Sequence, residues 1–207
     1  MAVCEVSSVI AKGGRGFVLA GAAAMAVAVP FSFYAAAALA ALTLFFVFVF
    51  RDPRRTIGDG IVAPADGTVR EVDPEKGFVS TYLALRNVHV TRAPIDGVVQ
   101  KKNRLHGKHA PAFSEKTVHN ERLEIRLGTR LGEISIVQMT GALARRIVPY
   151  VSEGQALGKG QTLGLIRFGS RVDVFMPPSS VTILVKKGDR LRAGVTRIAE
   201  VCDGRVE

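Results

Sequence analysis

The chain has 207 residues, of which 48% are hydrophobic and 22% charged. This length and apolar content fit one compact domain with appendages, which excludes a disordered chain and a large multidomain protein. Lys and Arg exceed Asp and Glu by 28 to 18, and the net charge of +10 favours a phosphate-bearing partner such as nucleic acid or an anionic membrane surface. Because the sequence has no Trp, no aromatic RNA-binding motif and no helix-turn-helix pattern, we expect no nucleic-acid partner.

The first feature along the chain is an uncharged run, Phe17–Phe50. It is too long for a signal peptide, so residues 1–50 are expected to be an N-terminal helical membrane anchor. Pro30 interrupts the run, so either Phe31–Phe50 spans the membrane as one helix or two short helices form a hairpin that turns around Pro30–Tyr34. Basic residues flank both ends of the run, which favours the hairpin and the cytoplasmic face of the cell membrane.

The remaining residues, 51–207, are expected to form one β-rich catalytic domain. The motif Ala-Pro-x-Asp-Gly-x-Val occurs at 63–69 and 93–99, and Val-x-x-Gly-x-x-Leu-x-x-Gly occurs at 151–160 and 185–194. Each Asp-Gly step predicts a tight hairpin turn, because glycine adopts the positive φ that such turns require. Short strands with doubled hairpins indicate a mainly β fold, a compact barrel-sandwich-like domain of the kind seen in lipoyl and biotinyl carriers.

Metal-binding and carrier functions are not favoured by the motifs of this domain. The four histidines lack the spacing of a zinc-binding helix, and the two cysteines lie at opposite ends of the chain, so we expect no metal. The hairpin tips carry Asp-Gly and Glu-Gly, where a carrier would need the lysine that holds biotin or lipoate.

The main candidate for chemistry is the step Gly169-Ser170. A Gly-Ser step is more often a plain turn. However, glycine leaves its own carbonyl carbon sterically open and tolerates a strained backbone, so the Ser170 hydroxyl could attack that carbon and convert the peptide bond to an ester. Elimination and loss of ammonia would then leave a pyruvoyl group at residue 170. Because a serine hydroxyl is a weak nucleophile, a base and an orienting carboxylate should lie nearby.

Four pieces of the sequence resemble the phosphatidylserine decarboxylases, the pyruvoyl-dependent enzymes that make phosphatidylethanolamine: residues 62–69, 87–94, 141–148 and 160–173. The Phe-Gly-Ser-Arg at 168–171 is similar to the short prokaryotic branch, whereas longer members read Leu-Gly-Ser-Thr. The resemblance implies a proenzyme that cleaves itself between Gly169 and Ser170. The large chain, 1–169, and the small chain, 170–207, would stay together as a heterodimer, and the cofactor would be the pyruvoyl group made from Ser170.

The resemblance also implies roles for an aspartate and a histidine. Asp66 matches the aspartate of the family's Pro-x-Asp-Gly motif, which serves in an Asp-His-Ser triad for self-cleavage. Longer members carry His-x-x-His-x-Pro, and here His89 takes the first position and Arg92 the second. His89 would therefore perform both processing and proton donation, or another histidine such as His119 would supply one of them. Without catalysis, His89 would be a buried strand histidine and Asp66 a turn residue like Asp96.

The chemistry of the implied substrate accounts for further residues. Decarboxylation of an amino acid leaves a carbanion, and a pyruvoyl ketone that forms a Schiff base with the amine of phosphatidylserine supplies the electron sink. A histidine suits the protonation of the α-carbon. Arg145, Arg146 and Arg167 are candidates for holding the lipid phosphate, although each also fits a solvated strand charge. Two alternatives stay open: a non-enzymatic membrane-tethered β-domain adaptor, and a pyruvoyl decarboxylase of a free amino acid.

Overall fold

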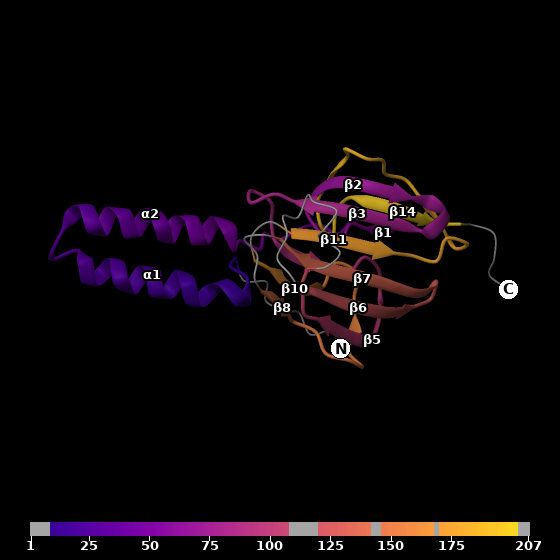
Figure 1. The fold of residues 1–207 in the computed structure, drawn as a ribbon, viewed down its shortest axis with the longest axis horizontal. Coiled ribbons are helices and arrows are strands. Elements are labelled where there is room, and N and C mark those ends of the chain that lie inside the picture. The colour runs from indigo at the N-terminus through magenta and orange to yellow at the C-terminus, as the bar shows by residue number, and fades with distance from the viewer. Residues whose placement is uncertain (1–8, 108–119, 142–145, 168–169, 203–207) are drawn as a thin grey trace. The chain divides into compact units, whose positions relative to one another are not determined.

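The computed structural model describes residues 9–107, 120–141, 146–167 and 170–202 (Figure 1). The chain divides into two compact units, Met1–Arg54 and Arg55–Glu207. The first unit is helical and the second consists mainly of strands.

The first unit is a helical hairpin. Its elements are the 3-10 turn η1 (Lys12–Gly14) and the helices α1 (Arg15–Ala28) and α2 (Phe33–Val49). Ser32 caps α2, because its side chain accepts a hydrogen bond from the backbone N–H of Ala35 at 3.3 Å. The helices pack along each other, with the rings of Phe17 and Phe46 centred 5.6 Å apart.

Of the two geometries expected for the uncharged run, the hairpin is the one observed. The helices are joined by residues 29–32, slightly earlier than the expected turn at Pro30–Tyr34. Among the described residues, no helix combines the length and the apolar character needed to cross a membrane. The membrane anchor therefore stays a prediction.

Within its described residues, the second unit contains three antiparallel sheets that enclose one apolar core. The large sheet has the strand order β13 (Arg190–Leu191), β2 (Gly67–Asp73), β3 (Phe78–Leu83), β11 (Ser170–Phe175), β7 (Gly132–Thr140), β6 (Arg122–Thr129), β5 (Gly97–Leu105) and β9 (Ala156–Leu157). One small sheet has the strand order β1 (Ile61–Val62), β14 (Arg197–Val201), β12 (Val181–Ile183). The other has the order β4 (Val90–Arg92), β10 (Thr162–Ile166), β8 (Ile147–Pro149). A 3-10 turn, η2 (Pro74–Lys76), joins β2 and β3. The mainly β class is confirmed, and the large sheet is curled like a half-barrel (Figure 1).

The two sequence repeats occupy equivalent places in this fold. The motif at 63–69 docks on the one at 185–194, since Val69 donates to Asp189 O at 2.9 Å and accepts from Gly188 N at 2.9 Å. The motif at 93–99 docks in the same way on 151–160, with Val99 bonded to the backbone of residues 154 and 155 at 2.8 and 2.9 Å. The repeat seen in the sequence is therefore a structural duplication.

The two Asp-Gly steps are not hairpin turns, so that expectation was wrong. At the first step the chain passes from β1, which pairs with β14, to β2, which pairs with β3 and β13. At the second it passes from β4 to β5, which again lie in different sheets. The physical reason is that each aspartate accepts a hydrogen bond from the backbone of the docked motif, at residue 193 or 159, instead of closing a turn between paired strands.

Candidate active site

Ser170 is the first residue of β11, a central strand of the large sheet. It pairs with Leu83 at the end of β3 and with Thr140 at the end of β7. Because side chains alternate along a strand, Ser170 shares the core-facing side of β11 with Val172 and Val174. Ser170 is completely buried, and its Oγ has no hydrogen-bond partner among the described residues. A buried hydroxyl without a partner lowers stability, which makes it a candidate for a functional group.

The core becomes polar at the end where Ser170 lies. Along β7 the core-facing side chains change from isoleucine to Gln138 and Thr140. Gln138 Nε2 donates to Thr91 Oγ1 at 2.9 Å, and Thr91 Oγ1 donates to Gly164 O at 3.2 Å. Gln138, Thr91 and Thr140 are completely buried, yet sequence reasoning did not select them.

His89 lies at the same polar end. It directly precedes β4, and Ile166 N donates to His89 O at 3.1 Å, which extends the ladder between β4 and β10. Since Thr91 faces Gln138, alternation places His89 on the core side as well, and it is 1% exposed. His89 is therefore a buried histidine directly before β4 and next to β10, the strand that precedes Ser170 in the chain.

Two of the three predicted phosphate-binding arginines lie close together. Arg167 directly follows β10, and its backbone N–H donates to Arg146 O at 3.2 Å. Burial, and next the nearby Arg146, lower the pKa of the Arg167 guanidinium. Neighbouring guanidinium groups are typical of a site that receives an anion such as phosphate. Arg145, Gly169 and His119 lie outside the described residues.

Asp66 forms a buried ion pair that the sequence did not predict. Its carboxylate accepts hydrogen bonds from both terminal nitrogens of Arg55, including Nη2 to Oδ2 at 2.8 Å, and from Ala193 N at 2.7 Å. The two charged side chains are 4% and 11% exposed. Every hydrogen bond described for this carboxylate goes to Arg55 or Ala193.

Strand pairing nevertheless places Asp66 and Ser170 at the same end of the large sheet. Asp66 directly precedes β2, where Thr68 pairs with Tyr82 of β3. The next residue of β3, Leu83, pairs with Ser170. Asp66 and Ser170 are thus separated by one intervening strand.

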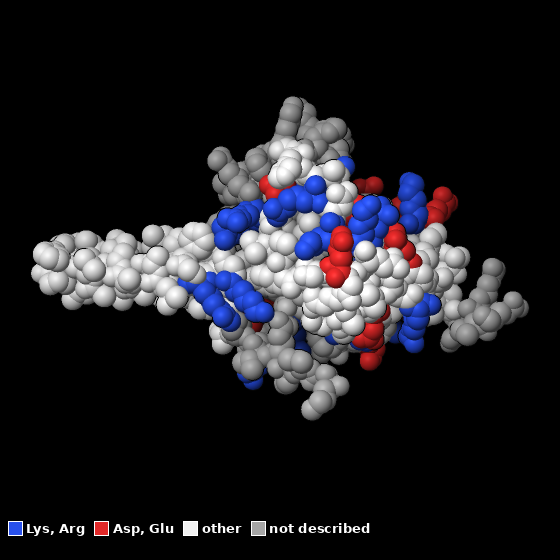
Figure 2. Space-filling model, turned by 90° about the horizontal axis from the view of Figure 1, so that it is seen from below, with Lys and Arg blue, Asp and Glu red and all other residues white. Residues whose placement is uncertain are grey.

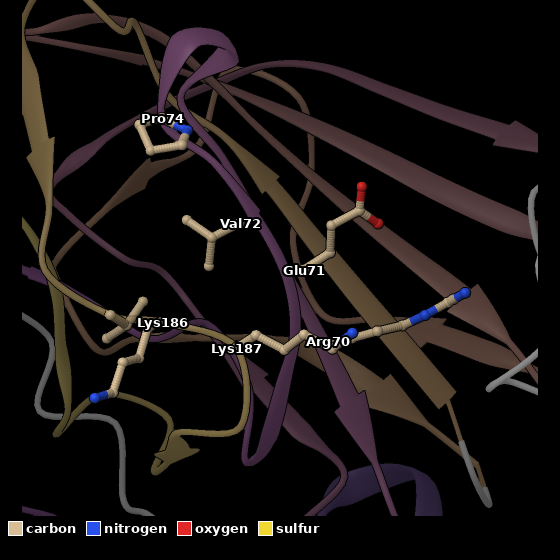
Figure 3. A pocket seen from close by; sticks show the side chains of 7 residues that line it. Arg70, Glu71, Val72, Pro74, Lys186 and Lys187 are labelled. Carbon is tan, nitrogen blue, oxygen red and sulfur yellow. The ribbon is translucent and has the colours of Figure 1, made fainter.

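A separate hollow of about 540 Å³ lies between β2 and residues 185–187 (Figure 3). Its lining includes Arg70, Glu71, Lys186 and Lys187 but none of the residues predicted for the active site. In Figure 3 the side chains of Lys186 and Arg70 extend in opposite directions. The hollow therefore does not present a set of charges that converge on one ligand.

A buried serine, a buried histidine and two neighbouring arginines lie at one end of a β core, and together they define a candidate enzyme active site. Residues 42–199 match the family described as phosphatidylserine decarboxylase. A phosphatidylserine decarboxylase proenzyme of Streptomyces griseus is 45% identical over 153 residues, which cover 72% of this chain and 71% of the relative. Proteins of the same name from Streptomyces avermitilis (46%; 72% and 71% covered) and Carboxydothermus hydrogenoformans (39%; 73% and 78% covered) are also similar. The chain belongs to the phosphatidylserine decarboxylase family.

Proposed function

We propose that this protein is a self-processing phosphatidylserine decarboxylase, which releases CO2 from phosphatidylserine to give phosphatidylethanolamine. The observation that carries the proposal is Ser170: within the family match, the completely buried first residue of a central strand has a hydroxyl without a partner among the described residues. Such a group fits a serine whose hydroxyl reacts within the protein. Family membership favours this function over an adaptor or a decarboxylase of a free amino acid.

In the proposed self-cleavage, Ser170 Oγ forms a bond to the carbonyl carbon of Gly169, the bond from that carbon to the Ser170 nitrogen breaks, and the hydroxyl proton passes to the nitrogen. Elimination from the resulting ester then separates chain 1–169, which ends in a carboxylate, from chain 170–207, which begins with dehydroalanine. Water adds to this dehydroalanine and ammonia leaves, which gives the pyruvoyl group. The pyruvoyl group left at residue 170 supplies an electron sink for decarboxylation. The two chains remain one heterodimer, because β11 of the small chain pairs on both sides with strands of the large chain.

The other predicted residues receive roles in this proposal. His89 moves protons, because a buried imidazole beside the strand that leads to Ser170 is suited to general acid and base chemistry. Arg146 and Arg167 hold the phosphate of the lipid, with Arg145 as a further candidate. Asp66 supplies negative charge at the same end of the sheet and assists self-cleavage.

The test of self-cleavage is a denaturing gel of the purified full chain. We expect two bands, with the small chain starting at residue 170 and blocked to amino-terminal sequencing. Ser170→Ala should give one intact, inactive chain, because no hydroxyl remains to attack Gly169. Ser80→Ala is the matched control, since Ser80 is also a completely buried serine of this sheet. Cleavage at the same bond in Ser170→Ala would refute the proposal.

We also propose that the helical hairpin anchors the enzyme to the cytoplasmic face of an anionic cell membrane. Residues 16–50 carry no charge, and the helices form an uncharged surface (Figure 2). Phe31 in the connection and Tyr34 in the first turn of α2 are 83% and 85% exposed. Ile10 pairs with Arg51, so the chain enters and leaves the hairpin at one end. The tip would enter the lipid while basic residues such as Arg15 and Arg51 stay at the anionic surface.

Removal of residues 1–50 tests this division of roles. The truncated protein should still cleave itself and decarboxylate detergent-dispersed phosphatidylserine, because the candidate active site belongs to the second unit. It should lose much of its activity on vesicles and bind anionic vesicles only at low salt, since screening weakens attraction between charges. If it sediments with vesicles at high salt as fully as the complete chain, the hairpin is not the anchor.

A further inference from the structure

Gln138 presents an acceptor oxygen of fixed orientation inside the polar end of the core. The Thr91 hydroxyl proton is used by Gly164 O, so Thr91 Oγ1 is left as an acceptor for the amide nitrogen of Gln138. These two hydrogen bonds determine which end of the amide faces Thr91. Gln138 Oε1 consequently faces elsewhere, and it is a buried acceptor with no hydrogen-bond partner among the residues that the structure describes.

The unpartnered oxygen of Gln138 lies on the same side of the sheet as the unpartnered hydroxyl of Ser170. In the pairing of β7 with β11, Gln138 is opposite Val172 and Ser170 is opposite Thr140. Gln138 and Ser170 are thus diagonal neighbours, whose Cα atoms lie about 7–8 Å apart in antiparallel sheets, within reach of a long side chain. One group has a proton to donate, and the other can only accept.

We infer that Gln138 Oε1 accepts the hydrogen bond of the Ser170 hydroxyl in the reactive precursor and thereby orients that hydroxyl for self-cleavage. This inference rests on the proposed function and adds a residue to it. With the hydroxyl proton directed toward Gln138, a lone pair of Ser170 Oγ is free to face the Gly169 carbonyl carbon. Thr91 is a positioning residue, because it acts only by holding the Gln138 amide.

Gln138 is not the base of this step. An amide oxygen is a weak proton acceptor, so the hydroxyl proton passes to the Ser170 nitrogen as the carbon–nitrogen bond breaks, with a base such as His89 as carrier. Gln138 contributes by orienting the Ser170 hydroxyl, because misplacement of a reacting group lowers the rate by up to about 100-fold. Loss of the Gln138 oxygen should therefore slow the formation of the ester and no later step.

The experiment follows cleavage of newly synthesised full chain in a cell-free system, with time points separated on denaturing gels. Gln138→Met keeps a side chain of similar length and removes the acceptor oxygen, so cleavage should slow by about 10- to 100-fold. The accumulated precursor should resist hydroxylamine, which cuts esters, because the ester is not formed. Ser80→Ala is the control: Ser80 Oγ is also buried and unpartnered among described residues, but Ser80 pairs with Asp173 on the opposite face of the sheet.

A second pair of variants tests the same inference if Gln138→Met does not fold. Thr91→Val removes the hydroxyl that holds the amide and should slow cleavage by about 10-fold, whereas Thr91→Ser keeps the hydroxyl and should restore nearly the original rate. Cleavage of Gln138→Met at the original rate, a hydroxylamine-sensitive precursor, or equal rates in the two Thr91 variants would overturn the inference. If the parent chain is cleaved normally, any of these results overturns the inference but leaves the proposed function intact. If the parent chain itself is not cleaved, the inference and the proposed function are both refuted.

Discussion

The two copies of the Asp-Gly motif have the same backbone contact but different surroundings. Asp96 accepts a hydrogen bond from Lys159 N at 2.7 Å, and Asp66 accepts the equivalent bond from Ala193 N at 2.7 Å. Asp96 is exposed, whereas Asp66 is buried and paired with Arg55. The shared hydrogen bond is therefore a property of the duplicated fold. A role of Asp66 alone in self-cleavage has to come from its burial and its pairing with Arg55, which Asp96 lacks among the described contacts.

The asymmetry comes from the segment that follows the helical unit. Arg55 binds Asp66, and Gly58 N donates to Gly194 O at 3.0 Å, both beside the same copy of the motif. Ile57 lies so close to Gly160 that an added Cβ there would be 2.2 Å from Ile57 Cδ1. Residues outside the repeat thus give two nearly equivalent sites different environments.

The largest effect is expected from Asp66→Asn. This change removes the negative charge but keeps an oxygen for Ala193 N, so self-cleavage should slow by about 10³-fold, by analogy with the loss of the orienting carboxylate in hydrolase triads. Asp96→Asn should be cleaved like the original chain. The measurement is the rate of conversion to two chains, with thermal unfolding of each precursor as a check on folding. Rapid, complete cleavage of Asp66→Asn would remove Asp66 from the mechanism.

The next effect is on stability and comes from Arg55→Met. Removing the guanidinium leaves the Asp66 carboxylate buried with only one described partner, which should lower the free energy of unfolding by about 3–5 kcal/mol. Urea unfolding in the Ser170→Ala background measures this on a single uncut chain. Lys76→Met, which breaks the exposed pair with Asp73, is the control and should have little effect. Equal urea midpoints for the two variants would show that the Arg55 pair does not stabilise this copy.

The smallest effect concerns two equivalent glycines with positive φ, Gly160 at 80° and Gly194 at 74°. Alanine at either position should cost about 1–2 kcal/mol, because a Cβ disfavours the left-handed conformation. Gly160→Ala should cost more, since its Cβ would collide with Ile57, whereas the nearest atom to a Cβ at Gly194 is Arg92 Cδ at 3.1 Å. Urea unfolding of both variants tests the order. A larger loss in Gly194→Ala would mean that Ile57 does not distinguish the copies.

Several features of the fold were readable from local patterns. Apolar and charged residues alternate in residues 123–127, which is typical of a strand with one buried face, and β6 buries Leu123, Ile125 and Leu127 there. The uncharged run with an internal proline allowed one helix or a hairpin of two helices, and the basic residues at both ends favoured the hairpin that is observed. The Asp-Gly steps were misread, because the sequence shows a tight bend but not whether the strands on either side pair with each other.

For the candidate site, the sequence indicated residues whose chemistry is unusual in their local context. Ser170 was selected in this way and His89 through the family resemblance, and both are buried at one end of the core. Gln138 and Arg55 were not selected, because a glutamine or an arginine alone gives no chemical signal. Their importance follows from partners far away in the chain: Gln138 bonds Thr91, and Arg55 binds both Asp66 and the Ala193 carbonyl.

The sequence by itself determined the mainly β class, the duplicated motifs and the Gly-Ser step, because each depends on residues that are neighbours in the chain. Only the tertiary structure decided which copies dock on each other, 63–69 with 185–194 and 93–99 with 151–160. It also decided that one aspartate of the duplicated pair is buried against Arg55 while the other is exposed. The physical reason is that burial and long-range hydrogen bonds depend on the packing of distant segments, which two copies of one local motif cannot specify.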